Sequence, residues 1–177
     1  AAGLAISEKM RGQIKSLNQA QRNAQDGISY IQTMEGALNE VSDMLTRAKE
    51  ICTQYENGTY TDSDKQNITD ELTALQAEIE HIRTNTTFNG IHMDEDVDIA
   101  IDDKGSKVTI GATDITGIDI SGATTADEIS AHIETVSSAR GALGALQNRL
   151  EHTSNNLGTT SENLTASESR IRDTDMA

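Results

Sequence analysis

Two stretches of this sequence carry apolar residues at a strict interval of seven, and this spacing restricts the possible folds more than any other feature. In the stretch from Leu4 to Tyr55 one row contains Met10, Leu17, Ala24, Ile31, Leu38, Leu45 and Cys52. Near the C-terminus a second row contains Ile129, Val136, Leu143, Leu150, Leu157, Leu164 and Ile171. A seven-residue repeat of this length is typical of helices wound around one another, because about 3.5 residues per turn keep the row facing its partner. We therefore interpret both rows as helix-seam packing.

The composition favours a thin seam over a thick globular core. Only 2% of the residues are aromatic and 35% are hydrophobic, whereas aromatic side chains usually dominate compact cores. The chain contains no proline, so no residue interrupts a helix through a missing N–H group. The sequence therefore predicts a mainly α fold, an elongated antiparallel helical bundle or coiled coil of two long helices and one shorter helix, with a small β-hairpin region.

Local signals place the ends of the predicted helices. We expect the first long helix to stop at Asn57-Gly58, with a left-handed residue after its last turn. A capping box of Ser63 and Gln66 predicts the start of the shorter helix, and a second box of Thr125 and Glu128 predicts the start of the last one. The shorter helix follows from apolar residues spaced alternately by four and three, and it should end before Asn89-Gly90; these residues are Ile68, Leu72, Leu75, Ile79 and Ile82.

Between the shorter helix and the last helix the apolar period changes to two. Val97, Ile99 and Ile101 alternate with other residues, and Val108 and Ile110 resume the alternation after a turn at 103–105, which predicts a hairpin. A third short strand is predicted across Ile115, Ile118 and Ile120. We therefore divide the chain into residues 1–90 (the long and the shorter helix), 91–125 (the β-hairpin region) and 126–177 (the last long helix of the same domain).

The charge balance argues against two classes of partner. The net charge is −15, whereas proteins that bind nucleic acids or anionic lipid need a basic surface. No run of about 18 apolar residues is present to cross a membrane, and no basic-then-apolar start indicates a secretory signal peptide. We predict neither a nucleic acid nor a membrane as a partner.

Motifs for catalysis and metal binding are absent from the sequence. The four histidines lack zinc-ligand spacing. Asp94, Asp96 and Asp98 start like a calcium loop, but Ile99 and Gly105 stand where an EF-hand needs glycine and glutamate. No G-x-S-x-G elbow is found. We predict no catalytic, metal-binding or cofactor-binding residue and no enzyme.

Five stretches closely resemble bacterial flagellin. They occur in the family's order, and the resemblance as a whole covers both ends of the chain and about two thirds of its length: "AAGLAISEKMRGQI" (1–14), "QDGISYIQTMEGALNEV" (25–41), "NTTFNGI" (85–91), "QNRLEHTSNNLG" (147–158) and "ENLTASESRIRDTDMA" (162–177). The resemblance implies a self-assembling structural subunit of the flagellar filament, which acts in motility and is secreted through the flagellum's own channel. It also implies the rod-shaped core of a short flagellin, without the terminal segments that line the filament's inner tube.

The resemblance further implies a set of partners. These are other flagellin subunits, flagellar export chaperones, the filament cap and, for some members, a Toll-like receptor of the vertebrate innate immune system. The family's receptor-contact patch maps onto Arg47, Ile51 and Glu71, although Thr46 and Ile51 depart from its usual residues. An alternative reading is another helical bacterial surface protein, such as a hook–filament junction protein or an adhesin.

Overall fold

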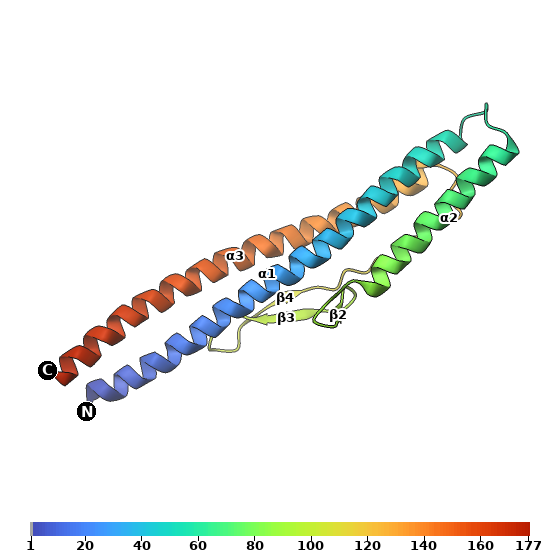
Figure 1. The fold of residues 1–177 in the computed structure, drawn as a ribbon. Helices are drawn as coiled ribbons and strands as arrows, with labels where there is room; N and C mark the ends of the chain where they lie inside the picture. The colour runs from blue at the N-terminus through green and yellow to red at the C-terminus, as the bar shows by residue number, and fades with distance from the viewer. Residues whose placement is uncertain (1) are drawn as a thin grey trace. The chain divides into compact units, whose positions relative to one another are not determined.

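The computed structural model describes residues 2–177, which form three helices and four short strands (Figure 1). The helices are α1 (Ala2–Tyr55), α2 (Asp62–Asn85) and α3 (Ala126–Met176). The strands are β1 (Thr87–Phe88), β2 (Ile91–His92), β3 (Val97–Ala100) and β4 (Lys107–Ile110). The predicted fold class, two long helices and a shorter one with a small β part, is confirmed.

The chain divides into two compact units, and both long helices contribute to each. Unit 1 contains the residues up to Tyr30, the β3–β4 hairpin (97–110) and residues 145–177. Unit 2 contains residues 31–96, with the rest of α1 and all of α2, and residues 111–144, with the start of α3. Each unit therefore joins segments that lie far apart in the sequence.

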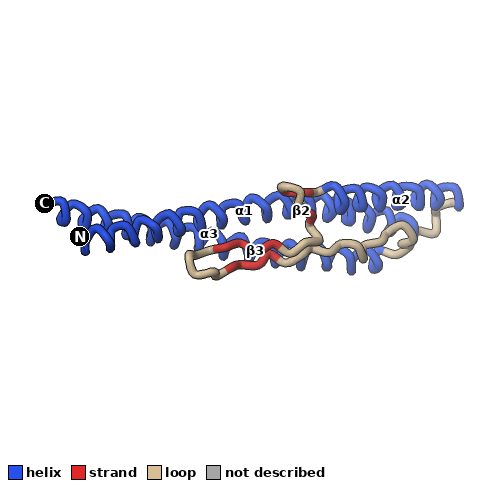
Figure 2. The backbone as a smooth tube through the Cα atoms, turned by 90° about the horizontal axis from the view of Figure 1, so that it is seen from below, coloured by secondary structure: helices blue, strands red, loops and turns tan. Residues whose placement is uncertain are grey.

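In unit 1 the segments of α1 and α3 run antiparallel. Ser7 is hydrogen-bonded to Glu168 and Asn18 to Ser161, so early residues of α1 meet late residues of α3. Strands β3 and β4 pair antiparallel, and Ile99 lies opposite Val108. Both of these side chains are buried, and Figure 2 shows the hairpin lying along the helices. The alternation of apolar residues predicted this hairpin correctly.

In unit 2 the start of α2 is fixed by a capping box two residues before the predicted one. The Thr61 side chain accepts a hydrogen bond from the Asp64 N–H at 3.2 Å, and Asp64 Oδ2 accepts one from the Thr61 N–H at 3.0 Å. Gln66 instead bonds Asp70 one turn later. The prediction of Ser63 and Gln66 was therefore wrong, because aspartate fills the role usually taken by Glu or Gln. At the start of α3 the predicted Thr125–Glu128 box is formed in part: Thr125 Oγ1 accepts a hydrogen bond from the Glu128 N–H at 3.3 Å, but Glu128 Oε1 accepts from the Thr125 hydroxyl, at 3.0 Å, and not from its backbone N–H.

The end of α1 differs from the prediction in its backbone conformation. The helix stops at Tyr55, close to the predicted position. Within residues 2–177, however, a positive φ occurs at Asn89, Gly90 and Gly105 and not at Gly58. The chain turns instead through Asn57, whose side-chain oxygen accepts a hydrogen bond from the Thr59 N–H at 3.1 Å. An Asn side chain that mimics a backbone turn removes the need for a left-handed residue.

The predicted third strand is not formed. Residues 115–123 make two turns, with hydrogen bonds from the Ile118 N–H to the Ile115 carbonyl and from the Ala123 N–H to the Ile120 carbonyl, each 3.1 Å. The Gln76 amide of α2 donates to the Ile118 carbonyl and accepts from the Ile120 N–H, at 3.0 and 2.9 Å. One side chain thus satisfies the backbone groups that a neighbouring strand would otherwise bond.

Candidate functional site

The predicted seam residues in unit 2 lie in its core. These residues are fully or almost fully buried: Ile31, Leu38, Leu45, Ile129, Val136 and Leu143. In unit 1 three further members are buried, namely Leu17, Leu150 and Leu157. Met10, Leu164 and Ile171, toward the ends of α1 and α3, are only half-buried.

A second row along α3 is polar, and it was not among the predicted seam residues. Ser154, Ser161 and Glu168 follow one another at seven-residue spacing, and all three are buried. Ser161 donates a hydrogen bond of 2.6 Å to Asn18 Oδ1, and Ser7 donates one of 2.6 Å to Glu168 Oε1. Buried polar groups need partners, so these bonds favour one alignment of α1 against α3 over slipped alternatives. The seven-residue spacing of these residues was the available signal.

Gly27 is required where α1 approaches both the hairpin and α3 in unit 1. A Cβ atom at this position would lie 2.9 Å from Leu150 Cδ1 and 3.0 Å from Ile99 Cγ1. Real Cβ atoms essentially never come this close to another carbon, so only glycine fits without movement of its neighbours. The sequence pattern alone does not distinguish this glycine from Gly36 on the same helix, where a Cβ atom would meet nothing within 4 Å.

Gly144 of α3 has no such neighbour, which leads to a prediction about stability. A Cβ atom there would meet nothing within 4 Å, and glycine inside a helix costs about 1 kcal/mol relative to alanine. We expect Gly144→Ala to raise the free energy of unfolding by about 1 kcal/mol, measured by urea denaturation. The matched change Gly158→Ala should gain less, because its Cβ would lie 2.7 Å from Gln21 Nε2. A destabilised Gly144→Ala protein would show that this glycine has an unseen packing role.

Two of the three predicted receptor-contact residues come together on the surface of unit 2. Arg47 of α1 donates to Glu71 of α2 through two nitrogens, at 2.9 Å to Oε1 and 3.3 Å to Oε2. A third contact of 3.4 Å joins Arg47 Nη1 to Glu50. The side chains of Arg47 and Glu71 are both 43% exposed, and the hydrogen bond with Glu71 raises the pKa of Arg47.

Ile51, the third of these residues, is 0% exposed. It belongs to the same buried row of α1 as Ala48 and Cys52. The side chain therefore packs inside unit 2 and presents no atom to a partner on the surface. Next to Arg47 the surface has a shallow hollow of about 330 Å³, lined by Glu40, Asp43, Met44, Arg47 and Leu75.

Asp96 and Asp98, which resemble the start of a calcium loop in sequence, form structural hydrogen bonds. Asp96 Oδ1 accepts a hydrogen bond from the Ala112 N–H at 2.7 Å, and Asp98 Oδ1 accepts one from the Thr109 hydroxyl at 2.6 Å. In the part of the chain that the structure describes, no cluster of three or more His, Cys, Asp or Glu side chains is arranged to hold a metal ion. Within residues 2–177, no helix is both long enough and apolar enough to span a membrane.

Cys52 lies in the core of unit 2. It is 0% exposed, and burial is the main cause that raises the pKa of its thiol, with Glu128 and Glu56 adding to the effect. A raised pKa keeps the sulfur protonated and lowers its reactivity as a nucleophile.

Comparison with known proteins identifies the family. Residues 1–96 match the bacterial flagellin N-terminal helical region, and residues 126–177 match the bacterial flagellin C-terminal helical region. A flagellin of Halalkalibacterium halodurans is 46% identical over 201 aligned positions, which include 100% of this chain and 72% of that protein. The chain thus spans about three quarters of the length of this relative.

The fold of the chain is also found in solved structures of flagellar proteins. A Bacillus cereus flagellin matches with a TM-score of 0.69 and 30% identity, over 77% of this chain and 88% of that one. A putative flagellar hook-associated protein of Vibrio parahaemolyticus has a TM-score of 0.60 over 96% of this chain and 94% of that one, but only 13% identity, so it shares the fold alone.

The two long helices, paired antiparallel, place the chain in the class of mainly helical proteins. The chain belongs to the bacterial flagellin family. It is a structural subunit of the extracellular flagellar filament, it polymerises with other flagellin subunits, and it serves motility. The family is not enzymatic, and the alternative of an adhesin or hook–filament junction protein does not fit the identity to flagellins.

Proposed function

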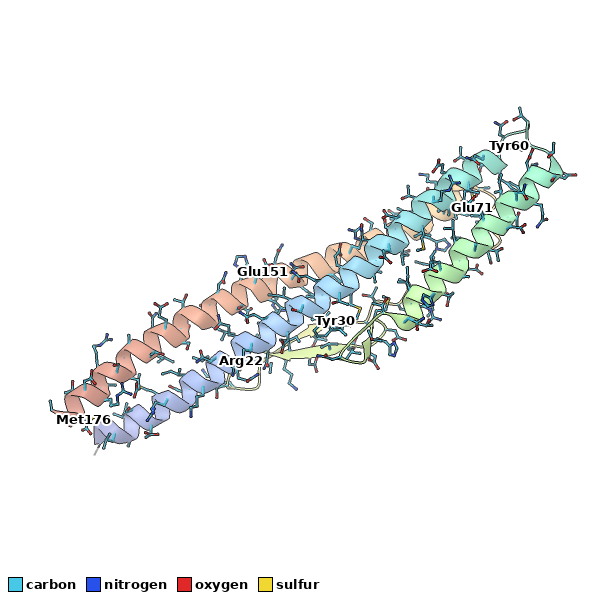
Figure 3. The ribbon with its side chains drawn as sticks, in the orientation of Figure 1. Arg22, Tyr30, Tyr60, Glu71, Glu151 and Met176 are labelled. Carbon is cyan, nitrogen blue, oxygen red and sulfur yellow. The ribbon has the colours of Figure 1, made fainter. Side chains whose placement is uncertain are left out.

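We propose that, besides building the filament, this chain is a ligand of a Toll-like receptor of the vertebrate innate immune system. The observation that carries the proposal is the exposed pair of Arg47 and Glu71. It joins α1 to α2 in unit 2, where Figure 3 labels Glu71, and it borders the hollow lined by Met44 and Leu75. An exposed arginine–glutamate pair beside a shallow apolar hollow suits protein recognition, because arginine is enriched among the residues that contribute most to the free energy of binding.

The contact surface in this proposal consists of Arg47 and Glu71. Ile51 supports them from within the core and does not touch the receptor, since its side chain is 0% exposed. The competing reading is a surface ion pair without a partner. Such an exposed pair contributes less than about 1 kcal/mol to stability, so stability alone does not distinguish the two readings.

Binding of the Arg47→Ala protein to the purified receptor ectodomain tests the proposal. We expect its affinity to fall about thirtyfold, because truncation of a central arginine typically costs about 2 kcal/mol. The matched control is Arg11→Ala, which removes a comparable exposed pair with Glu8 in unit 1, 2.9 Å long and with side chains 51% and 69% exposed. Equal affinities of the parent, the Arg47 variant and the Arg11 variant would rule out this surface.

We also propose the remaining partners and the division of the chain that the family resemblance implies. Flagellar export chaperones and the filament cap are expected to bind this chain as they bind other flagellins. Residues 91–125 are proposed as the variable β-hairpin region between 1–90 and 126–177. The family matches support this division, because they cover 1–96 and 126–177 and leave the residues between them unmatched.

A further inference from the structure

The connection between α1 and α2 contains an Asn-Gly pair, and a second such pair joins β1 to β2. Asn57-Gly58 follows the end of α1, next to Tyr60, which Figure 3 labels. Asn89-Gly90 forms the two-residue turn of the β1–β2 hairpin. Both asparagines are exposed, so access of water and base does not distinguish them. Their hydrogen bonds and backbone conformations differ.

We propose that Asn57 is a site of spontaneous deamidation in the folded protein and that Asn89 is protected. Deamidation begins when the backbone nitrogen of the following residue attacks the side-chain Cγ of asparagine. The attack needs a following residue without a side chain, and it needs the asparagine amide to be folded back over the next peptide. Gly58 meets the first need because it has no side chain to obstruct the approach of its nitrogen.

The Asn57 side chain meets the second need. Its Oδ1 accepts a hydrogen bond of 3.1 Å from the Thr59 N–H, so the amide is folded over the Gly58 peptide. The Thr59 hydroxyl donates a second bond to the same oxygen, at 3.0 Å. Two donors aimed at one amide oxygen stabilise the negative charge that develops there during the attack, as in an oxyanion hole. Thr59 therefore promotes the reaction as a positioning residue.

Every atom of the reaction comes from this segment and from water. A base in solvent takes the Gly58 N–H proton, the nitrogen forms a bond with Asn57 Cγ, and the former amide nitrogen takes up a proton and leaves as ammonia. The product is a five-membered succinimide between the two residues. One water molecule then opens the ring at either carbonyl and leaves aspartate or isoaspartate at position 57. No oxidant, metal or cofactor takes part.

Asn89 is held away from the reactive geometry by its turn. Its φ is 50° and that of Gly90 is 78°, values typical of the type I′ turn that joins two strands. The pairs Phe88–Ile91 and Thr87–His92 flank the turn directly. Closing the succinimide ring requires rotation of the Asn89 backbone, which opens these pairs. The strain and the lost pairing slow the reaction at this site.

The product changes the charge of an acidic region. Glu56, Asp62 and Asp64 already lie near position 57 in the sequence, so the new carboxylate adds repulsion to the connection between α1 and α2. Isoaspartate also lengthens the backbone by one methylene at this point.

Tryptic peptide mapping of the purified protein, incubated at neutral pH and physiological temperature, tests the proposal. Peptide 50–65 contains Asn57, and peptide 84–104 contains Asn89 together with Asn85, so fragment-ion sequencing assigns the converted position in the second peptide. We expect the first peptide to gain the mass of an amide-to-acid conversion, as aspartate and isoaspartate, about tenfold faster than the second. In the urea-unfolded protein both sites should convert at similar rates. A folded protein in which Asn57 converts no faster than Asn89 would overturn the proposal.

Two variants separate the contribution of the fold to the deamidation rate at Asn57 from the contribution of the Asn-Gly dipeptide itself. Gly58→Ala should nearly abolish conversion at position 57 without unfolding the protein, because its Cβ enters open space. Thr59→Val keeps the shape of the side chain but removes the hydroxyl donor, and it should slow conversion about tenfold, the equivalent of one hydrogen bond to a charged group. An unchanged rate in the Thr59 variant, with an unchanged circular dichroism spectrum, would contradict the role of Thr59.

Discussion

Replacing Leu150 with aspartate is expected to lower the free energy of unfolding by more than about 4 kcal/mol. Leu150 is 0% exposed, and its Cδ1 atom lies 2.9 Å from the position that a Cβ atom on Gly27 of α1 would take, within unit 1. The substitution removes a fully packed side chain, which alone costs about 2–5 kcal/mol. It also buries a carboxylate among apolar groups that offer it no partner.

Urea and thermal unfolding, followed by circular dichroism, measure this loss. Leu4→Asp is the matched control, because Leu4 lies on α1 with 49% of its surface exposed; we expect a change within about 0.5 kcal/mol. Leu150→Met, which conserves volume, should cost less than about 1.5 kcal/mol. If Leu150→Asp melts within a few degrees of the parent, the side chain at this position does not face the seam.

Gly27→Val is expected to destabilise the protein by about 2–3 kcal/mol, although valine has a higher helix propensity than glycine. The new Cβ would lie only 2.9 Å from Leu150 Cδ1 and 3.0 Å from Ile99 Cγ1, and valine adds two methyl groups beyond it. Both neighbours are buried, so neither moves aside without displacing the hairpin or α3. The steric clash thus lowers the free energy of unfolding by more than the higher helix propensity raises it, since the propensity gain is only a few tenths of a kcal/mol.

The matched control for this substitution is Gly36→Val on the same helix. Nothing lies within 4 Å of a Cβ atom at that position, so we expect equal or slightly higher stability. The comparison uses the midpoint of urea unfolding for both variants. Equal midpoints for the two valine variants would mean that α1 does not approach Leu150 and Ile99 at Gly27.

The helices were predictable because their packing repeats. A row such as Ile31, Leu38 and Leu45 places each residue on the same face of the helix, so one spacing rule identifies the whole seam. The β3–β4 hairpin was predictable for a similar reason, since Ile99 and Val108 belong to alternating runs that bury one face. These signals are local in sequence and need no knowledge of the partner segment.

Other features depend on segments that meet only after folding. The turns at Ile115–Ala123 replaced a predicted strand because Gln76, about forty residues earlier in the chain, bonds their backbone. The β1–β2 hairpin was missed because Asn89-Gly90 was interpreted only as a point where the shorter helix had already ended. The special need for glycine at position 27 likewise comes from distant residues, Ile99 and Leu150.

For the candidate site, the resemblance to flagellins identified three residues but not their exposure. Arg47 and Glu71 do meet at 2.9 Å, across a separation of 24 residues. Ile51 falls on the buried face of α1, because it lies three residues after the buried Ala48 and follows the period of the core. Burial of a single helix position depends on which neighbours cover it, and here α1 is covered on that side.

The central claim is that the start of α1 packs antiparallel against the end of α3, and nuclear Overhauser effects in the unmodified protein test it most directly. The structure predicts cross-peaks from the Gly27 α-protons to a Leu150 methyl group and to the side chain of Ile99, because a Cβ on Gly27 would lie about 3 Å from both. A spectrum in which the Leu150 methyl groups show cross-peaks only to residues of α3 itself would contradict this packing.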